Sequence, residues 1–220
     1  MGSCASSLLF LYGDIVFTFP GVQIAVRSYY IKALPTLPLA QLYDASYWEG
    51  RTSNYEGGVL EQWGMVDGQP FDRLSYYRDL ARRIAWKSPS SLLEVGCGPG
   101  LLLRELGRVS KIRLEGIDCS PWAVEHRVFP AVRLGFASDL PYEDKEFDLV
   151  FSHDLLEHIP VSHLEAALTE LARVGQRNYH IISCGSLVDD RDITHVTMKP
   201  IRWWRAFMPD LANFVFEAKG

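Results

Sequence analysis

The hydrophobic pattern of the chain switches between two periods, and this switching predicts alternating strands and helices. Short apolar runs that are typical of buried strands lie at residues 91–95, 113–118, 132–137, 146–154, 179–183 and 213–217. Apolar residues at helical spacing lie between them, at residues 73–90, 101–106, 161–174 and 200–207. Strands that alternate with helices favour a mostly parallel sheet flanked by helices, so the expected fold class is α/β.

Composition divides the chain into three regions. Residues 1–40 are apolar, and two strand-like segments at 14–19 and 22–27 flank a Pro-Gly turn, which predicts a β-like extension. Residues 41–72 are rich in aromatic residues and glycine, a composition that suits a lid better than a sheet. Residues 73–220 carry the alternating pattern and are expected to form the main domain.

Charge and cysteine content exclude several classes of protein. The net charge of −5 over 220 residues argues against a nucleic-acid partner. No apolar run reaches about 18 residues and the apolar N-terminal run lacks a basic flank, so neither a spanning helix nor a signal peptide is expected. The four cysteines form no Cys-x-x-Cys pair, so no metal site is predicted, and a cytoplasmic chain with reduced thiols is the simplest interpretation. The N-terminal Met-Gly-Ser-Cys matches a myristoylation pattern, although a cloning scar would read the same.

The most informative segment is the turn that follows residues 91–95. Gly96, Gly98 and Gly100 stand at alternate positions and lead directly into a helix. A glycine-rich turn between a strand and a helix lets the backbone approach a nucleotide-like ligand, because glycine has no Cβ and tolerates positive φ. Glu94 argues against a pyrophosphate, which a carboxylate would repel, and favours a ligand with a cationic group.

The string Glu94-Val95-Gly96-Cys97-Gly98-Pro99-Gly100 resembles the first motif of class I S-adenosylmethionine (SAM) methyltransferases. That cofactor carries an ammonium and a sulfonium and no phosphate. Later segments resemble further motifs of this family in the same order: the strand that ends at Asp118, residues 138–141 and residues 147–160. The resemblance spans residues 73–184 and implies a Rossmann-like fold with SAM as the cofactor, so residues 73–220 would form the SAM-binding catalytic domain.

The resemblance also implies which residues contact SAM. Asp118 would accept hydrogen bonds from the ribose, Asp139 would face the adenine amino group, and Tyr47 would close over the cofactor in an aromatic lid. Arg73 would bind the cofactor carboxylate, with Arg51 as the alternative. The expected cofactor contacts are Glu94, Gly96, Cys97, Gly98, Gly100, Asp118, Cys119, Ser138, Asp139, Leu140, His153, Arg73 and Tyr47.

Histidine is the natural base for an acceptor hydroxyl near neutral pH. His195 lies in the segment Thr194-His195…Lys199-Pro200, which resembles a loop over the acceptor site of ubiquinone-pathway O-methyltransferases. The alternative for His195 is a cap on the next helix or a pair with Asp192. His153, at the end of a strand, is the second catalytic candidate. His158 is expected to position the loop after that strand.

Together these observations favour a SAM-dependent methyltransferase, a transferase that methylates a small-molecule acceptor at oxygen. The alternatives are C- or N-methylation of a metabolite or sugar, and a non-catalytic methyltransferase-like binding module. A nicotinamide oxidoreductase fits less well, because Glu94 and the glycine spacing argue against it. Class I members commonly end in two strands, and only one is visible after residue 207, so the strand-like part of residues 1–40 could fill the vacant place or the chain could be truncated.

Overall fold

The structure is a computed structural model that describes residues 15–19, 22–26, 42–51, 53, 58–66, 69–185, 192, 194–207 and 213–219. The chain divides into two units, residues 1–33 and 34–220. In the first unit, strand β1 (Ile15–Phe19) pairs antiparallel with strand β2 (Val22–Val26). The two strands predicted there are confirmed, and the prediction that one of them completes the main sheet stays a prediction. The N-terminal Met-Gly-Ser-Cys lies outside the described residues.

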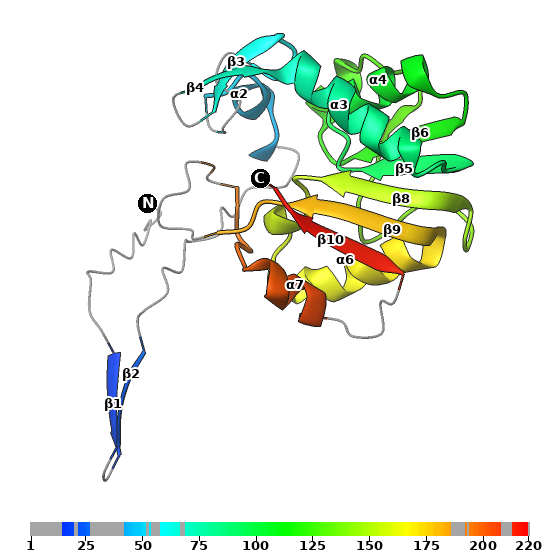
Figure 1. The fold of residues 1–220 in the computed structure, drawn as a ribbon. Coiled ribbons are helices and arrows are strands. Elements are labelled where there is room, and N and C mark those ends of the chain that lie inside the picture. Colours follow the sequence, from blue (N-terminus) through cyan, green and yellow to red (C-terminus); the bar gives the residue numbers. More distant parts are fainter. Residues whose placement is uncertain are drawn as a thin grey trace, which may run out of the picture. The chain divides into compact units, whose positions relative to one another are not determined.

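The second unit is built around a six-stranded sheet whose paired neighbours all run parallel (Figure 1). Its strands are β5 (Ser91–Val95), β6 (Arg113–Asp118), β7 (Val132–Leu134), β8 (Phe147–His153), β9 (Gly175–Ile182) and β10 (Phe214–Ala218). They lie in the order β10-β9-β8-β5-β6-β7. The chain moves outward from β5 in one direction, then returns to β8 and moves outward in the other. The carboxyl ends of β5 and β8 therefore form a topological switch point, where ligands bind in such sheets.

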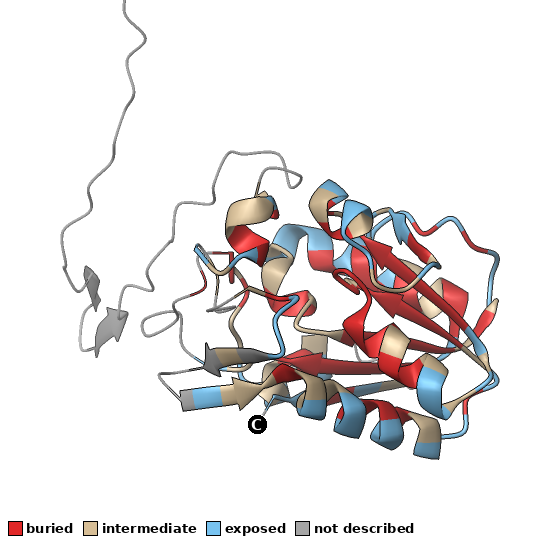
Figure 2. Cartoon of the chain, turned by 90° about the horizontal axis from the view of Figure 1, so that it is seen from above, coloured by how far each residue is buried: buried red, intermediate tan, exposed pale blue. Residues whose placement is uncertain are grey.

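Helices cover both faces of this sheet because its central strands are apolar on both sides. The helices are α3 (Arg73–Trp86), α4 (Leu101–Val109), α5 (Pro121–Glu125), α6 (Val161–Val174) and α7 (Ile201–Phe207). Leu92 packs with Leu103 of α4 in one core, whereas its neighbour Leu93 packs with Leu168 of α6 in another. Figure 2 shows the result, with buried strands between helices that expose their outer sides. The predicted Rossmann-like α/β fold is confirmed.

The segment before α3 contains a short helix and a small ribbon. Helix α2 (Ala45–Trp48) begins after Asp44, whose side chain caps it. Strand β3 (Trp63–Val66) pairs antiparallel with strand β4 (Gln69–Asp72). Residues 41–72, whose composition suits a lid better than a sheet, therefore do contain a small ribbon, and their role as a lid stays a prediction. Asp72 then caps α3, because its Oδ1 accepts a hydrogen bond from the Ser75 N–H.

Candidate functional site

The turn between β5 and α4 has a backbone conformation that glycine adopts most readily. Gly96, Gly98 and Gly100 have φ angles of 72°, 52° and 84°, all in the left-handed region. A Cβ on Gly96 would lie 2.8 Å from Leu155 Cδ1, and a Cβ on Gly100 would lie 2.8 Å from Val132 Cγ2. Side chains at these positions would displace their neighbours, so the alternate glycines serve both conformation and packing.

A cavity of about 380 Å³ lies beside this turn, at the carboxyl ends of the central strands. Many residues that the sequence linked to SAM line it: Glu94, Gly96, Cys97, Gly98, Asp118, Cys119, Ser138, His153 and Tyr47. Its size suits a small-molecule ligand, and its position is the switch point of the sheet. The sequence and the topology therefore indicate the same site.

Asp118 ends β6 and is held by two backbone donors. Its Oδ2 accepts a hydrogen bond from the Gly98 N–H (2.7 Å), and its Oδ1 accepts one from the Ser120 N–H (2.8 Å). Burial raises the pKa of Asp118 to about 6, although both hydrogen bonds oppose the rise. Each carboxylate oxygen has a second lone pair, so Asp118 can bind a ribose hydroxyl while it fixes the glycine turn.

Glu94 is a second buried acid in the same wall, and only 3% of it is exposed. Among the described residues, its Oε2 has no hydrogen-bond partner. Burial, and then the charge of Asp118, raises the pKa of Glu94 well above its usual range. A buried carboxylate with an unfilled lone pair favours a cationic ligand. The ammonium of SAM supplies such a charge, so these residues fit that cofactor.

The aromatic residues of the expected lid also line the cavity. Trp48 Nε1 donates hydrogen bonds to Ser120 Oγ (2.9 Å) and to the backbone oxygen of Tyr43 (3.0 Å). A Cβ on Gly98 would lie 3.1 Å from the Trp48 ring. The rings of Tyr43 and Tyr47 meet edge to face, with their centroids 4.8 Å apart. These contacts fix the aromatic wall against the glycine turn.

His153 lines the cavity from the end of β8. Its Nε2 lies 2.5 Å from the hydroxyl of Tyr76, and its Nδ1 lies 3.6 Å from Asp154 Oδ2. Burial lowers the pKa of His153 to about 4, although the charge of Asp154 opposes this. The ring is therefore neutral at pH 7. Asp154 has a positive φ of 51° and pairs with Lys219 Nζ, so its carboxylate is held in place.

The structure places His158, and not His195, in the cavity wall. His195 is buried, with 6% exposed, and the centroids of the His195 and His158 rings lie 4.5 Å apart. Burial, and then the charge of His195, lowers the pKa of His158 to about 4. Because His158 lines the cavity and His195 does not, a direct contact of His195 with a ligand there stays a prediction.

Four further residues expected at the cofactor do not line the cavity. Asp139 is exposed, and Leu140 is buried in the core under α6. Gly100 is explained by its packing rather than by contact with a ligand. Arg73 is buried (3% exposed) and donates hydrogen bonds of 2.8 Å to the carbonyl oxygens of residues 58 and 61. The alternative, Arg51, has a largely exposed side chain and pairs with its neighbour at position 49.

The sequence analysis missed the apolar part of the walls. Leu155, Ile159 and Pro160 follow β8 and line the cavity next to His158. Ala137 lines it after β7. The available signal was their position, because residues that follow a parallel strand at its carboxyl end face the switch point.

Comparisons with known proteins agree with this geometry. Residues 93–182 match a family model described as a methyltransferase domain. The match supports a class I SAM-dependent methyltransferase domain over this part of the chain. The cofactor of the domain is SAM.

Two relatives show how far the likeness extends. The ajmaline N-methyltransferase of Rauvolfia serpentina is 30% identical over 124 residues, which cover 52% of this chain and 42% of the relative. A protein of Oryza sativa subsp. japonica named probable tocopherol O-methyltransferase is 34% identical over 164 residues, which cover 66% of this chain and 45% of the relative. This chain therefore spans about half the length of these relatives, and their names differ in the atom that is methylated.

A solved structure shows the same fold. A chain of the complex between the Haloferax volcanii Trm112 methyltransferase activator and a methyltransferase is 22% identical, with a TM-score of 0.50. The match covers 63% of this chain and 71% of that chain. Within the described part of the chain, none of the helices has the length and apolar character needed to span a membrane.

Proposed function

We propose that this protein transfers a methyl group from SAM to an oxygen atom of a small-molecule acceptor. The observation that carries the proposal is the cavity at the switch point, which combines two buried carboxylates with an apolar recess and neutral imidazoles. Methyl transfer from a sulfonium is an in-line displacement with an activated donor. The protein therefore has to orient the reactants and exclude water more than it has to activate the donor.

The carboxylates define the proposed cofactor half of the cavity. Glu94 would bind the cationic end of SAM, because its Oε2 is buried and has no hydrogen-bond partner among the described residues. Asp118 would accept the ribose hydroxyls, and its bond from the Gly98 N–H would hold the turn close to the cofactor. Cys97, Cys119 and Ser138 line the same walls and are the proposed neighbours of the cofactor.

The apolar recess supports a small acceptor with a hydrophobic body. Leu155, Ile159 and Pro160 line it together with the ring of Tyr43. Such a lining is typical of small-molecule sites, in which a few polar groups fix the orientation of the ligand. The net charge of −5 gives no support to a nucleic-acid acceptor.

An acceptor hydroxyl must lose its proton during transfer, and we assign this step to His153. It lines the cavity and is neutral at pH 7, so one ring nitrogen keeps a lone pair; to act as the base, Nε2 would exchange the Tyr76 hydroxyl, 2.5 Å away, for the acceptor hydroxyl. His195 would act through His158, whose ring it contacts, as a positioning residue. Replacing His153 with glutamine should lower turnover about 10²–10⁴-fold and leave the affinity for S-adenosylhomocysteine nearly unchanged. His126→Gln, at an exposed histidine after α5, is the matched control, and normal turnover in His153→Gln would refute the assignment.

N-methylation is the second candidate, because one relative is named an N-methyltransferase. A neutral amine has a lone pair for the attack and needs no base before the transfer. Wild-type protein and His153→Gln should therefore be compared on phenols, alcohols and amines, with the gain of one methyl read by mass spectrometry. Hydroxyl acceptors that require His153 would support oxygen, whereas amine turnover that ignores the substitution would support nitrogen.

The proposal is tested first by binding. Calorimetric titration with S-adenosylhomocysteine should show one site per chain, and NAD should show no binding at the same concentrations. A folded protein that binds no S-adenosylhomocysteine would refute the proposed function. A protein that binds it but methylates nothing in a broad acceptor panel would favour the non-catalytic alternative.

A further inference from the structure

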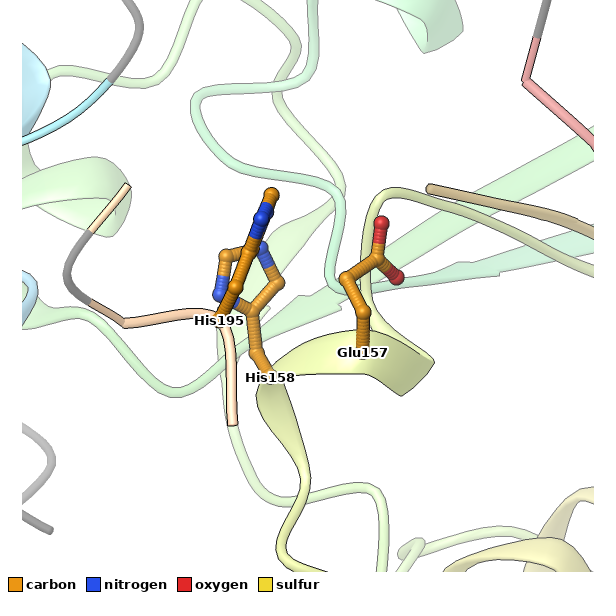
Figure 3. A group of neighbouring side chains, drawn as sticks. All are labelled: Glu157, His158 and His195. Atoms are coloured by element: carbon orange, nitrogen blue, oxygen red, sulfur yellow. The ribbon is translucent and has the colours of Figure 1, made fainter. Parts of the chain in front are cut away.

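Three potential metal ligands lie together beside the cavity, and one of them, His158, lines it. Glu157 and His158 belong to a 3₁₀ turn (Leu156–His158) after β8, and His195 lies in the segment before α7. One ligand atom from each residue lies within 4.8 Å of the other two. Figure 3 shows the two imidazole rings beside each other, with the Glu157 carboxylate next to them. The chain thus brings a carboxylate and two imidazoles together from two separate segments.

Glu157 makes this group more than a chance cluster. It is fully buried (0% exposed), and its Oε1 accepts a hydrogen bond from the Ser183 N–H (2.7 Å). Its Oε2 has no hydrogen-bond partner among the described residues. The nearby ammonium of Lys219 pairs with Asp154 instead. A buried carboxylate with an unfilled lone pair is costly unless a cation lies beside it.

The backbone of Glu157 also holds the segment that carries His195. The carbonyl oxygen of Glu157 accepts hydrogen bonds from the N–H groups of Val196 and Thr197, both at 2.9 Å. The side chain of Thr197 in turn donates to the carbonyl oxygen of Ile159 (2.7 Å). These contacts place His195 beside the 3₁₀ turn, so the two segments form one rigid site.

A hydrogen-bond chain orients His158 as a ligand. The Thr194 hydroxyl donates to Asp192 Oδ1 (2.6 Å), because a carboxylate can only accept. The Thr194 oxygen can then only accept from His158, whose Nδ1 lies 2.9 Å away. This assigns the proton to Nδ1 and leaves a lone pair on Nε2. Carboxylates that orient a histidine in this way commonly support metal ligands.

We propose that Glu157, His158 and His195 bind a divalent transition-metal ion. Two imidazoles and one carboxylate suit Mn²⁺, Fe²⁺ or Zn²⁺ better than Mg²⁺ or Ca²⁺, which prefer oxygen ligands. Metal–ligand bonds of about 2.1 Å keep any two ligand atoms within about 4.2 Å, and the ligand atoms here all lie within 4.8 Å of one another, so an approach of roughly 0.6 Å at most brings every pair into this range. Rotation of the Glu157 or His195 side chain supplies such a movement.

The ion would have a specific use in the acceptor half of the cavity, and this part rests on the proposed function. Three protein ligands leave coordination positions open, and His158 is itself a wall residue of the cavity. An acceptor hydroxyl bound at an open position would be a stronger acid than the free hydroxyl, and its proton would pass to His153 or to water. The metal would then orient the acceptor oxygen toward the methyl group.

The test is a metal titration of the full chain after treatment with a chelator. Mn²⁺ binding is followed by the loss of the free-ion electron paramagnetic resonance signal, and Zn²⁺ is added as a competitor. We expect one Mn²⁺ per chain, displaced by Zn²⁺ and not by an equal concentration of Mg²⁺. Glu157→Gln and His195→Gln should each weaken Mn²⁺ binding at least about 10-fold, and Thr194→Val about 10–100-fold. His126→Gln, which removes an exposed histidine, should leave it unchanged.

S-adenosylhomocysteine affinity and circular dichroism on the same samples separate loss of the ion from loss of the fold. If Glu157→Gln does not fold, His195→Gln decides, because it lies outside the helices and strands. A chelated wild-type chain that binds neither Mn²⁺ nor Zn²⁺, or variants that bind Mn²⁺ as the wild type does, would overturn the metal site. Failure to bind S-adenosylhomocysteine with intact Mn²⁺ binding would instead contradict the proposed function and leave the metal site standing.

Discussion

Replacing Asp118 with asparagine tests the cofactor half of the site where the structure is most specific. The carboxylate accepts hydrogen bonds from the Gly98 N–H (2.7 Å) and the Ser120 N–H (2.8 Å) and retains lone pairs for a ribose. Asparagine keeps the size of the side chain but replaces one carboxylate oxygen with an NH₂ group. That NH₂ group is a donor and cannot accept the hydrogen bond from the Gly98 or Ser120 N–H. The variant therefore disturbs the glycine turn and the ribose contact together.

The expected loss follows from the charge-assisted hydrogen bonds to the ribose. Such bonds contribute about 1.5–3 kcal/mol, which corresponds to about 10–100-fold in the affinity for SAM. Calorimetric titration with S-adenosylhomocysteine measures this directly. Asp139→Asn is the matched control, because Asp139 is exposed and lies just beyond the wall residue Ser138.

Two outcomes would refute this reasoning. Unchanged affinity in Asp118→Asn, with the melting temperature of the wild type, would show that Asp118 does not hold the cofactor. A larger loss in Asp139→Asn than in Asp118→Asn would show that Asp139 makes the adenine contact expected from the sequence and contributes more to cofactor binding than Asp118 does.

Two substitutions test the packing around the same turn. Gly100→Ala would bring a Cβ to 2.8 Å from Val132 Cγ2 at a positive φ, so a loss of about 1–3 kcal/mol of stability is expected, read as a lower melting temperature. Trp48→Phe removes the hydrogen bond to Ser120 Oγ and keeps an aromatic ring, so it should weaken S-adenosylhomocysteine binding with little change in folding. A Trp48→Phe protein that binds as the wild type does would argue against a lid that depends on this anchor.

Local periodicity predicted the core of the fold, because the apolar runs that became β5, β6 and β8 are buried on both faces. The predicted strand boundaries are wrong where tertiary contacts determine where a strand begins or ends. Strand β9 begins at Gly175, earlier than the apolar run at 179, because polar residues there still pair with β8 and Arg177 binds Asp148 (2.9 Å). Strand β7 ends at Leu134, because the chain turns into a bridge between Phe136 and Asp139.

The candidate site also has a part that the local sequence predicts and a part that depends on tertiary contacts. Residues in and next to the turn after β5 could be predicted, because alternately spaced glycines and a preceding acid form a pattern that is visible in the local sequence. Arg73 was not, because whether a guanidinium meets a ligand or a pair of carbonyl oxygens depends on how residues 58–61 pack. His195 was expected at the acceptor, which stays a prediction; its contact with the ring of the wall residue His158 joins two distant segments, and the local sequence does not reveal it.

The buried acids of the cavity link the stability of the protein to its ligand through pH. Burial raises the pKa of Asp118 from an ordinary 3.8 to about 6, so the folded state holds this proton more tightly than the unfolded chain does. Ionisation of Asp118 therefore lowers the free energy of unfolding. This destabilisation is absent below pH 4, grows as the pH rises toward 6, and reaches about 3 kcal/mol above pH 6. The proposed ribose contact needs the carboxylate, so affinity for S-adenosylhomocysteine should fall as the pH is lowered through 6, by up to about 10-fold per pH unit for one proton. Titrations from pH 5 to 8 measure this slope, and Asp118→Asn should flatten it. Equal slopes in both proteins would assign the titration to Glu94, whose pKa burial also raises.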